Sequence, residues 1–435
     1  MKVINWETQY PGIEFYDIQK KIITENKEKT GVFLGTGVGK TLTCLVLAEG
    51  RTLVVCPKQQ KLDNTWQKNN TKFNLGKEVE SISYEMLRRD WDLIDGYDTV
   101  IFDECHRVLG VLPETRQRNR VSIPKTSQLF EAALMYLRKY PPKRMYFASA
   151  TPVSKPMNLW ALAKLMGKDW DFYKFRETFY FATMMGRRQV WMPRKDESTR
   201  QRLALAVQKF GYTGGLADFM DVPEQTHLPV TIPLSDEQKH GLKKLNDEEA
   251  DPMVKRARMR TIENGILYGK EIQTVSDLED KMVKSTTFFK NGKIDYIIER
   301  AEEFPKLFIF AAYTAQVFAI SEALKKEGYD VTTVTGQTKG RDTVFEEVEA
   351  KEKGIVVVQA AVCEGYRVPS APCMIFASKS NRFLHFDQGK GRIMDGQHLK
   401  KNLFIHLITE GEGADHDCHE NIMSGQDFQE KLSVL

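Results

Sequence analysis

The stretch GVFLGTGVGKTLTCLVLAEG, residues 31–50, decides how the rest of the chain is interpreted. Residues 30–34 (TGVFL) are predicted to form a short strand, and residues 40–50 have apolar side chains at helical spacing. A strand, a glycine-rich loop and a helix in this order are typical of a phosphate-binding loop. Glycines let successive backbone N–H groups turn inward, and the helix N-terminus adds its positive dipole end. The sequence therefore predicts a phosphate site made of Gly35, Thr36, Gly37, Val38, Gly39, Lys40 and Thr41.

Two side chains of this loop carry the chemistry that the motif predicts. Lys40 is expected to reach the β- and γ-phosphates of ATP, and the hydroxyl of Thr41 is expected to ligate Mg²⁺. The strict form of the motif has glycine at position 34, where this chain has Leu34. Taken alone, the segment leaves an alternative open, namely a glycine-rich turn that contains a lysine and binds no phosphate.

An acidic pair follows at the end of another predicted strand, in the sequence DECH. Asp103 could hold Mg²⁺, directly or through water, and Glu104 would then be placed to polarise the attacking water. An acidic pair at a strand end is common and is usually only solvated. Because this one follows a phosphate loop in the same α/β region, the two motifs together predict one catalytic site.

Short apolar runs alternate with helix-like segments in two separate parts of the chain. Because such alternation favours parallel sheets covered by helices, we predict an α/β protein with two parallel-sheet lobes. The predicted boundaries are 1–165 for an ATP-binding lobe, 166–290 for a mainly helical insertion and linker, and 291–435 for a second lobe. The strand-like runs are 52–56, 99–104, 144–150, 228–234, 307–313, 329–334, 354–360, 373–378 and 403–408, and the clearest helices are 126–140 and 314–328.

The composition excludes several classes of protein. The chain has 435 residues, of which 41% are hydrophobic and 28% charged, and this balance indicates a folded chain of more than one domain. Its apolar runs are too short for a membrane helix, and the N-terminal residues lack the apolar core of a signal peptide. The six cysteines contain no CxxC pair, which favours a reduced, cytoplasmic environment over disulfides or zinc. A net charge of +4 permits a polyanionic partner without requiring one.

Six motifs occur in the order LGTGVGKT, TLVVCPK, ISYEMLRR, DECH, SATP and QGKGRIMDGQ. Together with residues 150–166 and 172–179, they resemble the superfamily 2 helicases, in the Swi/Snf-type DNA translocase branch. The resemblance spans nearly the whole chain, and the short length is similar to that of minimal members in phage genomes. It implies two RecA-like lobes, ATP and Mg²⁺ as cofactors, and duplex, single-stranded or branched DNA as the partner, with a host-cytoplasm location for a phage protein.

The resemblance also implies roles for individual residues. Gln19 corresponds to the glutamine that reads adenine, and Ser149, Ala150 and Thr151 correspond to the motif that couples nucleotide state to nucleic-acid grip. Cys105 and His106 would take part in that coupling. The motifs that contact nucleic acid correspond to Pro57, Lys58, Ser83, Tyr84 and Ala311, and those that face ATP from the second lobe to Gly365, Gln388 and Arg392.

One motif departs from the family pattern. It usually reads Q-x-x-G-R-x-x-R, and here Asp395 replaces the second arginine. An arginine that faces the γ-phosphate neutralises charge in the transition state. The hypothesis is that Arg392 performs this role alone; compensation by Lys390 or Arg382, or slow hydrolysis, are the alternatives.

Two basic segments and one polar segment lie outside these motifs. Residues 114–120 are predicted to form a polar loop, and residues 186–195 place Arg187 and Arg188 near Trp191, a combination that could clamp phosphates and stack on a base. The alternative for this second segment is a solvated loop with its tryptophan folded into the core. His416, Cys418 and His419 lack a second ligand pair and are interpreted as structural, and Trp66, Trp91, Trp160 and Trp170 as core residues.

The sequence thus predicts an ATP-dependent DNA translocase or helicase. An RNA helicase is the first alternative, because the DECH motif does not exclude RNA. The second is an ATP-gated clamp that binds nucleic acid with weak turnover, which Asp395 makes conceivable. Protein partners are not predicted.

Overall fold

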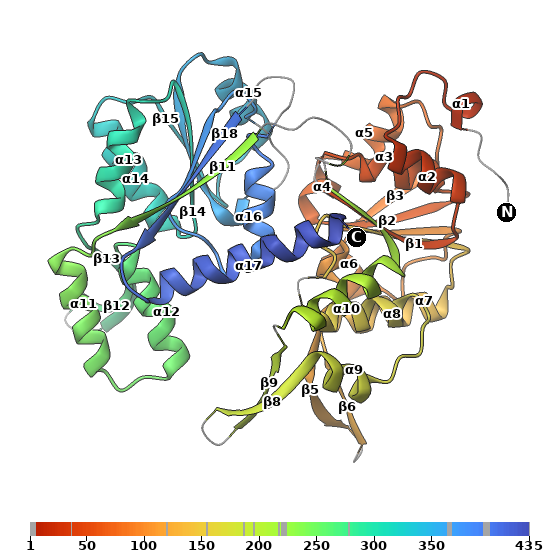
Figure 1. Ribbon diagram of the computed structural model, residues 1–435, viewed down its shortest axis with the longest axis horizontal. Helices are drawn as coiled ribbons and strands as arrows, with labels where there is room; N and C mark the ends of the chain where they lie inside the picture. The colour runs from red at the N-terminus through yellow and green to blue at the C-terminus, as the bar shows by residue number, and fades with distance from the viewer. Residues whose placement is uncertain are drawn as a thin grey trace. The chain divides into compact units, whose positions relative to one another are not determined.

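The computed structural model describes residues 6–35, 37–118, 121–153, 155–185, 188–194, 196–215, 218, 224–276, 279–362, 368–394 and 401–434. The chain divides into two compact units: unit 1 is Met1–Met220 with Asp427–Leu435, and unit 2 is Asp221–Gln426. Each unit contains one six-stranded sheet in which all neighbouring strands are parallel (Figure 1). The predicted α/β class with two parallel sheets is therefore confirmed.

The sheet of unit 1 has the strand order β10-β1-β7-β4-β2-β3. Its side chains alternate strictly between two hydrophobic clusters: Phe33, Phe102 and Phe147 belong to one cluster, and Val32 and Tyr146 to the other. Both faces are buried because helices cover both, so each strand is apolar throughout. The strands are β1 (Lys29–Leu34), β2 (Thr52–Cys56), β3 (Val79–Ser83), β4 (Thr99–Asp103), β7 (Arg144–Ala148) and β10 (Gly211–Gly214).

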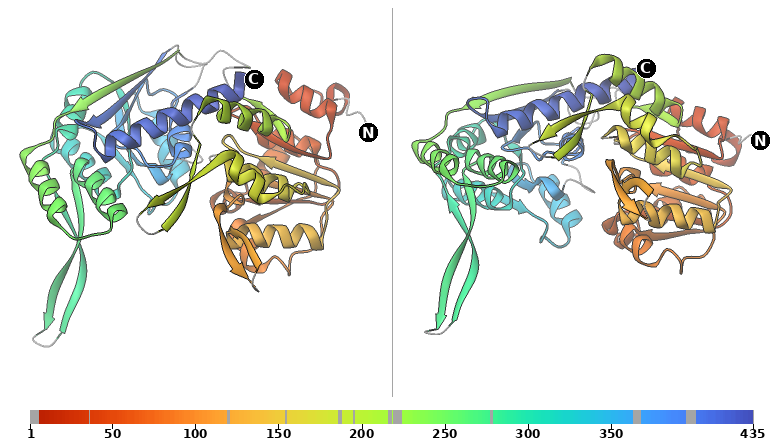
Figure 2. Two further views of the ribbon diagram at one scale, coloured as in Figure 1. Left: turned by 60° about the horizontal axis from the view of Figure 1, so that its bottom comes forward. Right: turned by 90° about the horizontal axis from the view of Figure 1, so that it is seen from below.

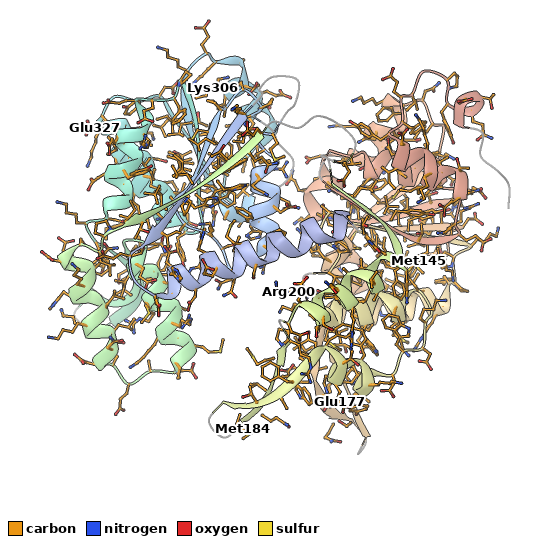
Figure 3. The ribbon with its side chains drawn as sticks, viewed as in Figure 1. Met145, Glu177, Met184, Arg200, Lys306 and Glu327 are labelled. Atoms are coloured by element: carbon orange, nitrogen blue, oxygen red, sulfur yellow. The ribbon has the colours of Figure 1, made fainter. Side chains whose placement is uncertain are left out.

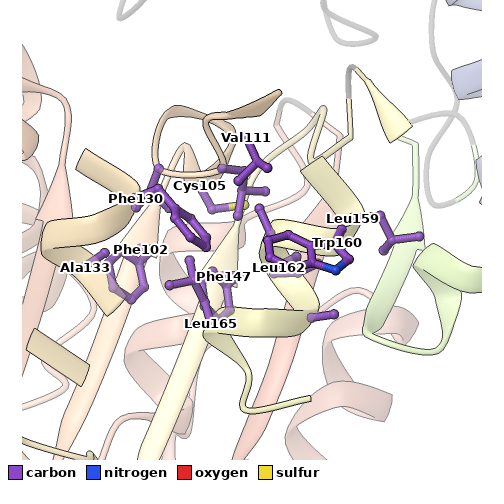
Figure 4. Packing of buried hydrophobic residues seen from close by; sticks show 14 of the residues in the cluster. Phe102, Cys105, Val111, Phe130, Ala133, Phe147, Leu159, Trp160, Leu162 and Leu165 are labelled. Atoms are coloured by element: carbon purple, nitrogen blue, oxygen red, sulfur yellow. The ribbon is translucent and has the colours of Figure 1, made fainter. Parts of the chain in front are cut away.

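Two groups of helices cover this sheet. On one face lie α2 (Asp17–Glu25), α3 (Lys40–Leu47) and α5 (Thr65–Lys72). The other face is covered by α6 (Tyr84–Asp90), α7 (Gln128–Lys139), α8 (Pro156–Leu165), α9 (Phe172–Phe179) and α10 (Glu197–Gln208), and Figure 4 shows part of this packing, with Phe130 of α7 and Trp160 of α8 close to Phe102 and Phe147. Short helices α1 (Trp6–Gln9) and α4 (Lys58–Leu62) complete the unit.

Two β-hairpins extend from unit 1. The first is β5 (Val111–Arg118) with β6 (Val121–Thr126), and the second is β8 (Tyr180–Met185) with β9 (Arg188–Pro193). The prediction that residues 114–120 form a polar loop is wrong for the described part of that segment. Its polar residues pair with the alternating strand β6, and this cross-strand pairing outweighs their low strand propensity. Met184 on the second hairpin is exposed (Figure 3).

The sheet of unit 2 has the order β11-β18-β17-β14-β16-β15. Helices α13 (Gly292–Ala301) and α14 (Thr314–Lys326) cover one face, and α15 (Arg341–Ala350), α16 (Phe383–Lys390) and α17 (Ala414–Val434) pack on the other. Its strands are β11 (Glu224–Ile232), β14 (Lys306–Ala311), β15 (Val331–Val334), β16 (Gly354–Gln359), β17 (Cys373–Phe376) and β18 (Lys401–Thr409).

A further part of unit 2 lies outside this sheet. Helices α11 (Asp236–Asp247) and α12 (Pro252–Glu263) form a pair, from which the hairpin β12 (Ile266–Ser276) and β13 (Glu279–Phe288) projects (Figure 2). Residues 166–290 are therefore not mainly helical and not a separate insertion, since β10 joins the first sheet and β11 the second. The charged composition was misleading because β11 is a sheet-edge strand with most of its side chains exposed, so it lacks the continuous apolar pattern of a buried strand.

Among the residues that the structure describes, no helix is long and apolar enough to cross a bilayer. The described cysteines are all free and buried.

Candidate nucleotide site

Three strand ends meet at one edge of the unit 1 sheet. Val32 of β1 and Asp103 of β4 both pair with Ala148 of β7, so the residues that follow these strands lie at the same edge. The glycine loop follows β1, the acidic pair ends β4, and Ser149 follows β7. Ligands of open parallel sheets bind outside the carboxyl ends of the strands. The register thus brings together the motifs that the sequence predicted to act as one site.

The glycine loop has the backbone that its sequence requires. Gly37 and Gly39 have φ angles of 90° and 77°, in the left-handed region that favours glycine, and Gly39 is the N-cap of α3. Leu34 is the last residue of β1 and its side chain is buried. The missing glycine at position 34 therefore belongs to the strand and not to the phosphate loop. Thr36 lies outside the described residues.

Gln19 lies against this loop. Its side-chain amide Nε2 donates to the Gly39 carbonyl at 3.2 Å and to the Thr43 hydroxyl at 3.1 Å, and its Oε1 accepts the backbone N–H of Tyr16 at 2.9 Å. The side chain is only 2% exposed, so Gln19 is a buried residue of α2. Gln19 connects α2 to the start of α3, and its predicted role in reading adenine stays a prediction.

Gly39→Ala should weaken nucleotide binding. The alanine would have to keep a φ near 77°, and its Cβ would lie 2.6 Å from Gln19 Nε2. The backbone strain alone costs about 1–2 kcal/mol, or roughly tenfold in affinity when the loop shifts to relieve it. We expect this loss in a titration with a fluorescent ATP analogue. Gly328→Ala is the matched control, since Gly328 has a φ of 89° with nothing within 4 Å of an added Cβ, and it should leave nucleotide affinity unchanged. Equal affinity of the Gly39 variant and wild type would contradict the proposed loop geometry.

Lys40 points back over the loop. Its Nζ donates to the carbonyls of Leu34 at 3.0 Å and Gly35 at 3.2 Å. An ammonium group beside a glycine loop at a helix N-terminus suits phosphate oxygens, which could replace these two carbonyl acceptors. Thr41, the second residue of α3, is half-buried. The residues of this loop therefore fit a nucleoside triphosphate.

Asp103 is buried at the end of β4. Its Oδ1 accepts the backbone N–H of Glu104 at 2.9 Å, and its Oδ2 accepts the indole N–H of Trp66 at 3.2 Å. Burial, with the neighbouring charge of Glu104, raises the pKa of Asp103, whereas Lys40 and Trp66 lower it. Each carboxylate oxygen retains a lone pair. A divalent cation would favour the ionised form, so Asp103 fits a Mg²⁺ site.

Glu104 has a strained backbone and a clear charge state. Its φ is 49°, in the left-handed region, at a cost of about 1–2 kcal/mol for a residue with a side chain. Burial by itself raises its pKa, but the hydrogen bond from His106 and the charge of Lys40 together hold the pKa of Glu104 below its usual value. Glu104 is therefore the ionised partner in this acidic pair. Strain of this kind is found preferentially at functional sites.

Ser149 and His106 hold the Glu104 carboxylate. Ser149 Oγ donates to Glu104 Oε2 at 3.3 Å and accepts the backbone N–H of Thr151 at 3.2 Å. His106 Nδ1 lies 3.3 Å from Glu104 Oε2 and 3.2 Å from Ser149 Oγ. The structure thus brings the DECH motif and residues 149–151 into direct contact, as the coupling prediction requires. Ala150 is half-buried, and Cys105 is buried in the core.

Most of the unit 1 residues that were predicted to contact nucleic acid are buried or make contacts within unit 1. Pro57 is buried ahead of the exposed Lys58. The hydroxyl of Ser83 caps α6, and the buried Tyr84 hydroxyl donates to the carbonyl of Asp103 at 2.5 Å. Neither hydroxyl is exposed to a nucleic-acid strand in this structure. The ring of Trp191 lies 3.8 Å from the guanidinium carbon of Arg176 and packs against the core, as its alternative interpretation expected. Arg187 and the side chain of Arg188 lie outside the described residues.

The described residues of unit 2 that were predicted to contact nucleic acid or ATP lie at the end of β14 and in or just after α16. Ala311 ends β14 and its side chain is buried. Gln388 lies in α16, and Arg392 follows that helix, with its backbone N–H bonded to the Gly389 carbonyl at 3.0 Å. Both side chains are largely buried. Gly365 and Asp395 lie outside the described residues.

Sequence reasoning missed two residues that hold Asp103. Trp66 was interpreted as a core residue only, and Tyr84 as a nucleic-acid contact, yet both donate hydrogen bonds to Asp103. A usable signal existed for Trp66, because a buried indole N–H needs a partner, and this tryptophan is the one buried residue of the polar helix α5.

The fold and the site describe a two-sheet α/β protein with a candidate phosphate loop in unit 1. No family model matches the chain, and a search of curated proteins found no match. Among solved structures, the chain is similar to the helicase domain of Hef from Pyrococcus furiosus, with 13% sequence identity over 96% of this chain and 99% of that one, at a TM-score of 0.48.

Proposed function

We propose that this protein is an ATP-dependent DNA translocase or helicase that hydrolyses Mg-ATP to move along or remodel DNA. The observation that carries the proposal is that the Lys40 loop, the buried carboxylate of Asp103 and the half-buried carboxylate of Glu104 meet at one sheet edge. A purely structural acidic pair would need neither the strained backbone of Glu104 nor the opposed pKa shifts of its two members.

Each residue of the site has a role in this proposal. Lys40 and the loop N–H groups bind the β- and γ-phosphates, and Glu104 accepts a proton from the attacking water. Ser149 and His106 orient Glu104 through the contacts described above. Thr41 and Asp103 would hold Mg²⁺, which supplies neutralisation of phosphate charge. Gln19 keeps the loop in register with α2.

We assign Arg392 and Gln388 of unit 2 to the same reaction, on the strength of the QGKGR motif. Arg392→Ala should lower nucleic-acid-stimulated ATP turnover by about 10³-fold, because it removes a positive charge from the transition state, while ATP binding is retained. Lys390→Ala is the matched control, because Lys390 Nζ lies 5.1 Å from the ring centroid of Phe386, and this contact suggests a packing role. Full turnover of the Arg392 variant would remove this arginine from the reaction, and a loss confined to the Lys390 variant would transfer the role to Lys390.

DNA is the proposed track because residues 150–166 and 172–179 resemble the Swi/Snf-type branch. The deciding measurement is ATP turnover in parallel with no nucleic acid, duplex DNA, single-stranded DNA and RNA. Stimulation by duplex DNA supports the proposal, and stimulation by RNA alone would make the protein an RNA helicase. Binding without stimulation would support the clamp that the Asp395 substitution makes conceivable. Contacts to phosphates predict weak sequence preference and strong salt dependence.

A further inference from the structure

A groove of about 850 Å³ runs beside β10, the edge strand of the unit 1 sheet. It lies between the helix layers, and its wall includes Ile18 of α2, Met166 and Trp170. Among the described residues, none of the predicted site residues lines it. Five lysines surround it, and these define the lysine groove: Lys21, Lys27, Lys29, Lys168 and Lys209.

Three of these lysines have no acidic partner among the described residues, and a fourth, Lys21, is close enough to Glu25 for its charge to lower the pKa of that carboxylate. Lys27 is paired with Glu25 at 3.0 Å and lies over the ring of Tyr212, 4.7 Å from its centroid. Within the described part of the chain, Lys21, Lys29, Lys168 and Lys209 make no side-chain hydrogen bond or ion pair. Glu25 is the only carboxylate among the described residues of the lining. The groove therefore carries a local excess of positive charge.

The negative ends of nearby helix dipoles are the simplest structural explanation for the lysines around the groove. They account for only some of these lysines. Lys27, Lys168 and Lys209 follow the C-termini of α2, α8 and α10, where basic residues offset the negative end of the helix dipole. Three helix ends amount to about −1.5 charges, and Glu25 adds one more. Five ammonium groups exceed that sum by about 2.5 charges, so the helix ends do not account for all of them.

The basic surface continues beyond the groove. A neighbouring cavity of about 270 Å³ shares Lys29 and Lys168 with it and adds Arg138 and Lys164. Lys164 is paired with Asp169, whereas no side-chain partner of Arg138 occurs among the described residues. The combined surface is too large for a single phosphate ion and suits an extended anion.

We propose that the lysine groove binds the sugar-phosphate backbone of a single nucleic-acid strand, at a site on unit 1 distinct from the candidate nucleotide site. The inference rests on the proposed function for the identity of the polyanion. Lysines bind phosphates as point charges, and the apolar wall of Ile18, Met166 and Trp170 suits sugars and bases better than it suits an acidic peptide. The lining has few groups that could read base edges, so binding should be independent of sequence.

The test uses the full chain with Lys21→Glu, Lys29→Glu and Lys209→Glu combined. The matched control changes the same number of exposed lysines in unit 2: Lys325→Glu, Lys326→Glu and Lys353→Glu. Binding of a single-stranded oligonucleotide is measured across a salt series. Loss of three phosphate contacts should reduce the slope of log K against log salt by about 2, because each contact contributes roughly 0.7. The ratio of the oligonucleotide affinity of wild type to that of the groove variant should then fall by about 15-fold between 50 and 200 mM salt.

A second readout locates the contact directly. Oligonucleotide should protect Lys21, Lys29 and Lys209 of wild type from acetylation, with Lys325 as the unprotected internal control. The proposal for the lysine groove would be overturned if the groove variant kept the wild-type salt slope and the oligonucleotide protected none of the three lysines. If the protein still bound DNA and hydrolysed ATP, the proposed function would remain intact. Failure of wild type to bind any nucleic acid would overturn both. Protection by polyglutamate and not by oligonucleotide would replace the strand with an acidic peptide.

Discussion

Glu104→Gln should lower nucleic-acid-stimulated ATP turnover by about 10²–10⁴-fold, the range that general base catalysis contributes. Glutamine has the same size and can keep the φ of 49° that Glu104 adopts, so the loop around it should not move. Its amide oxygen can still accept from Ser149, but it cannot take a proton from water. ATP binding should therefore be unchanged. The measurement is single-turnover hydrolysis together with analogue binding.

Ser149→Ala separates positioning from catalysis. It removes the hydroxyl that donates to Glu104 at 3.3 Å, and the lost bond to a charged acceptor should cost roughly 1.5–3 kcal/mol, or about 10- to 100-fold in rate. The loss should be smaller than that of Glu104→Gln. If Glu104→Gln keeps most of the wild-type turnover, Glu104 is not the base, whatever the serine variant does.

Lys293→Met should destabilise unit 2 by about 3–5 kcal/mol, the cost of leaving one member of a buried ion pair alone. Lys293 is 1% exposed, and its Nζ donates to Asp415 Oδ2 at 2.7 Å and to Asn264 Oδ1 at 2.8 Å. Asp415 in turn accepts from the hydroxyl of Thr409 at 3.2 Å. This network connects α13, β18, α17 and the end of α12, so its loss should affect the whole unit. Amide hydrogen exchange in β18 and α13 measures the change.

The stability of unit 2 should depend on pH through Asp415, in a direction that its pKa shift determines. Burial by itself raises the pKa of Asp415, but the charge and hydrogen bond of Lys293 hold it well below its usual value. In the wild type this carboxylate therefore stabilises unit 2 above its unfolded pKa of about 3.9, and the contribution is lost as pH falls further. In Lys293→Met the carboxylate of Asp415 loses the ammonium group of Lys293, so its pKa should rise. The loss of stability caused by this variant should therefore be smaller at pH 5 than at pH 7.

A double variant provides the control. Lys293→Met combined with Asp415→Leu removes both charges and should recover most of the stability that the single variant loses. A single variant that costs less than about 1 kcal/mol would show that the pair contributes little.

Local features were predictable because they depend on neighbouring residues. The strand, loop and helix around Lys40 follow from hydrophobic periodicity and from glycines that tolerate positive φ, and the structure has them at Lys29–Leu34 and Lys40–Leu47. The buried strands were equally clear, since continuous apolar runs mark strands covered on both faces. The hairpins were missed because their pairing partners, and not their own residues, decide their structure. The strand-like run predicted at 228–234 covers only the second half of the edge strand β11 (Glu224–Ile232).

The sequence by itself determined that two α/β units exist, that one carries a glycine loop with a lysine, and that an acidic pair ends a strand in the same unit. Tertiary structure alone decided that Trp66 and Tyr84 hold Asp103, that His106 and Ser149 hold Glu104, and that Lys293 meets Asp415 from 122 residues away. The physical reason is the distance along the chain over which each effect acts. Backbone preference and periodicity act over a few residues, whereas burial, and with it the pKa of each carboxyl group, is set by segments that only the folded chain brings together.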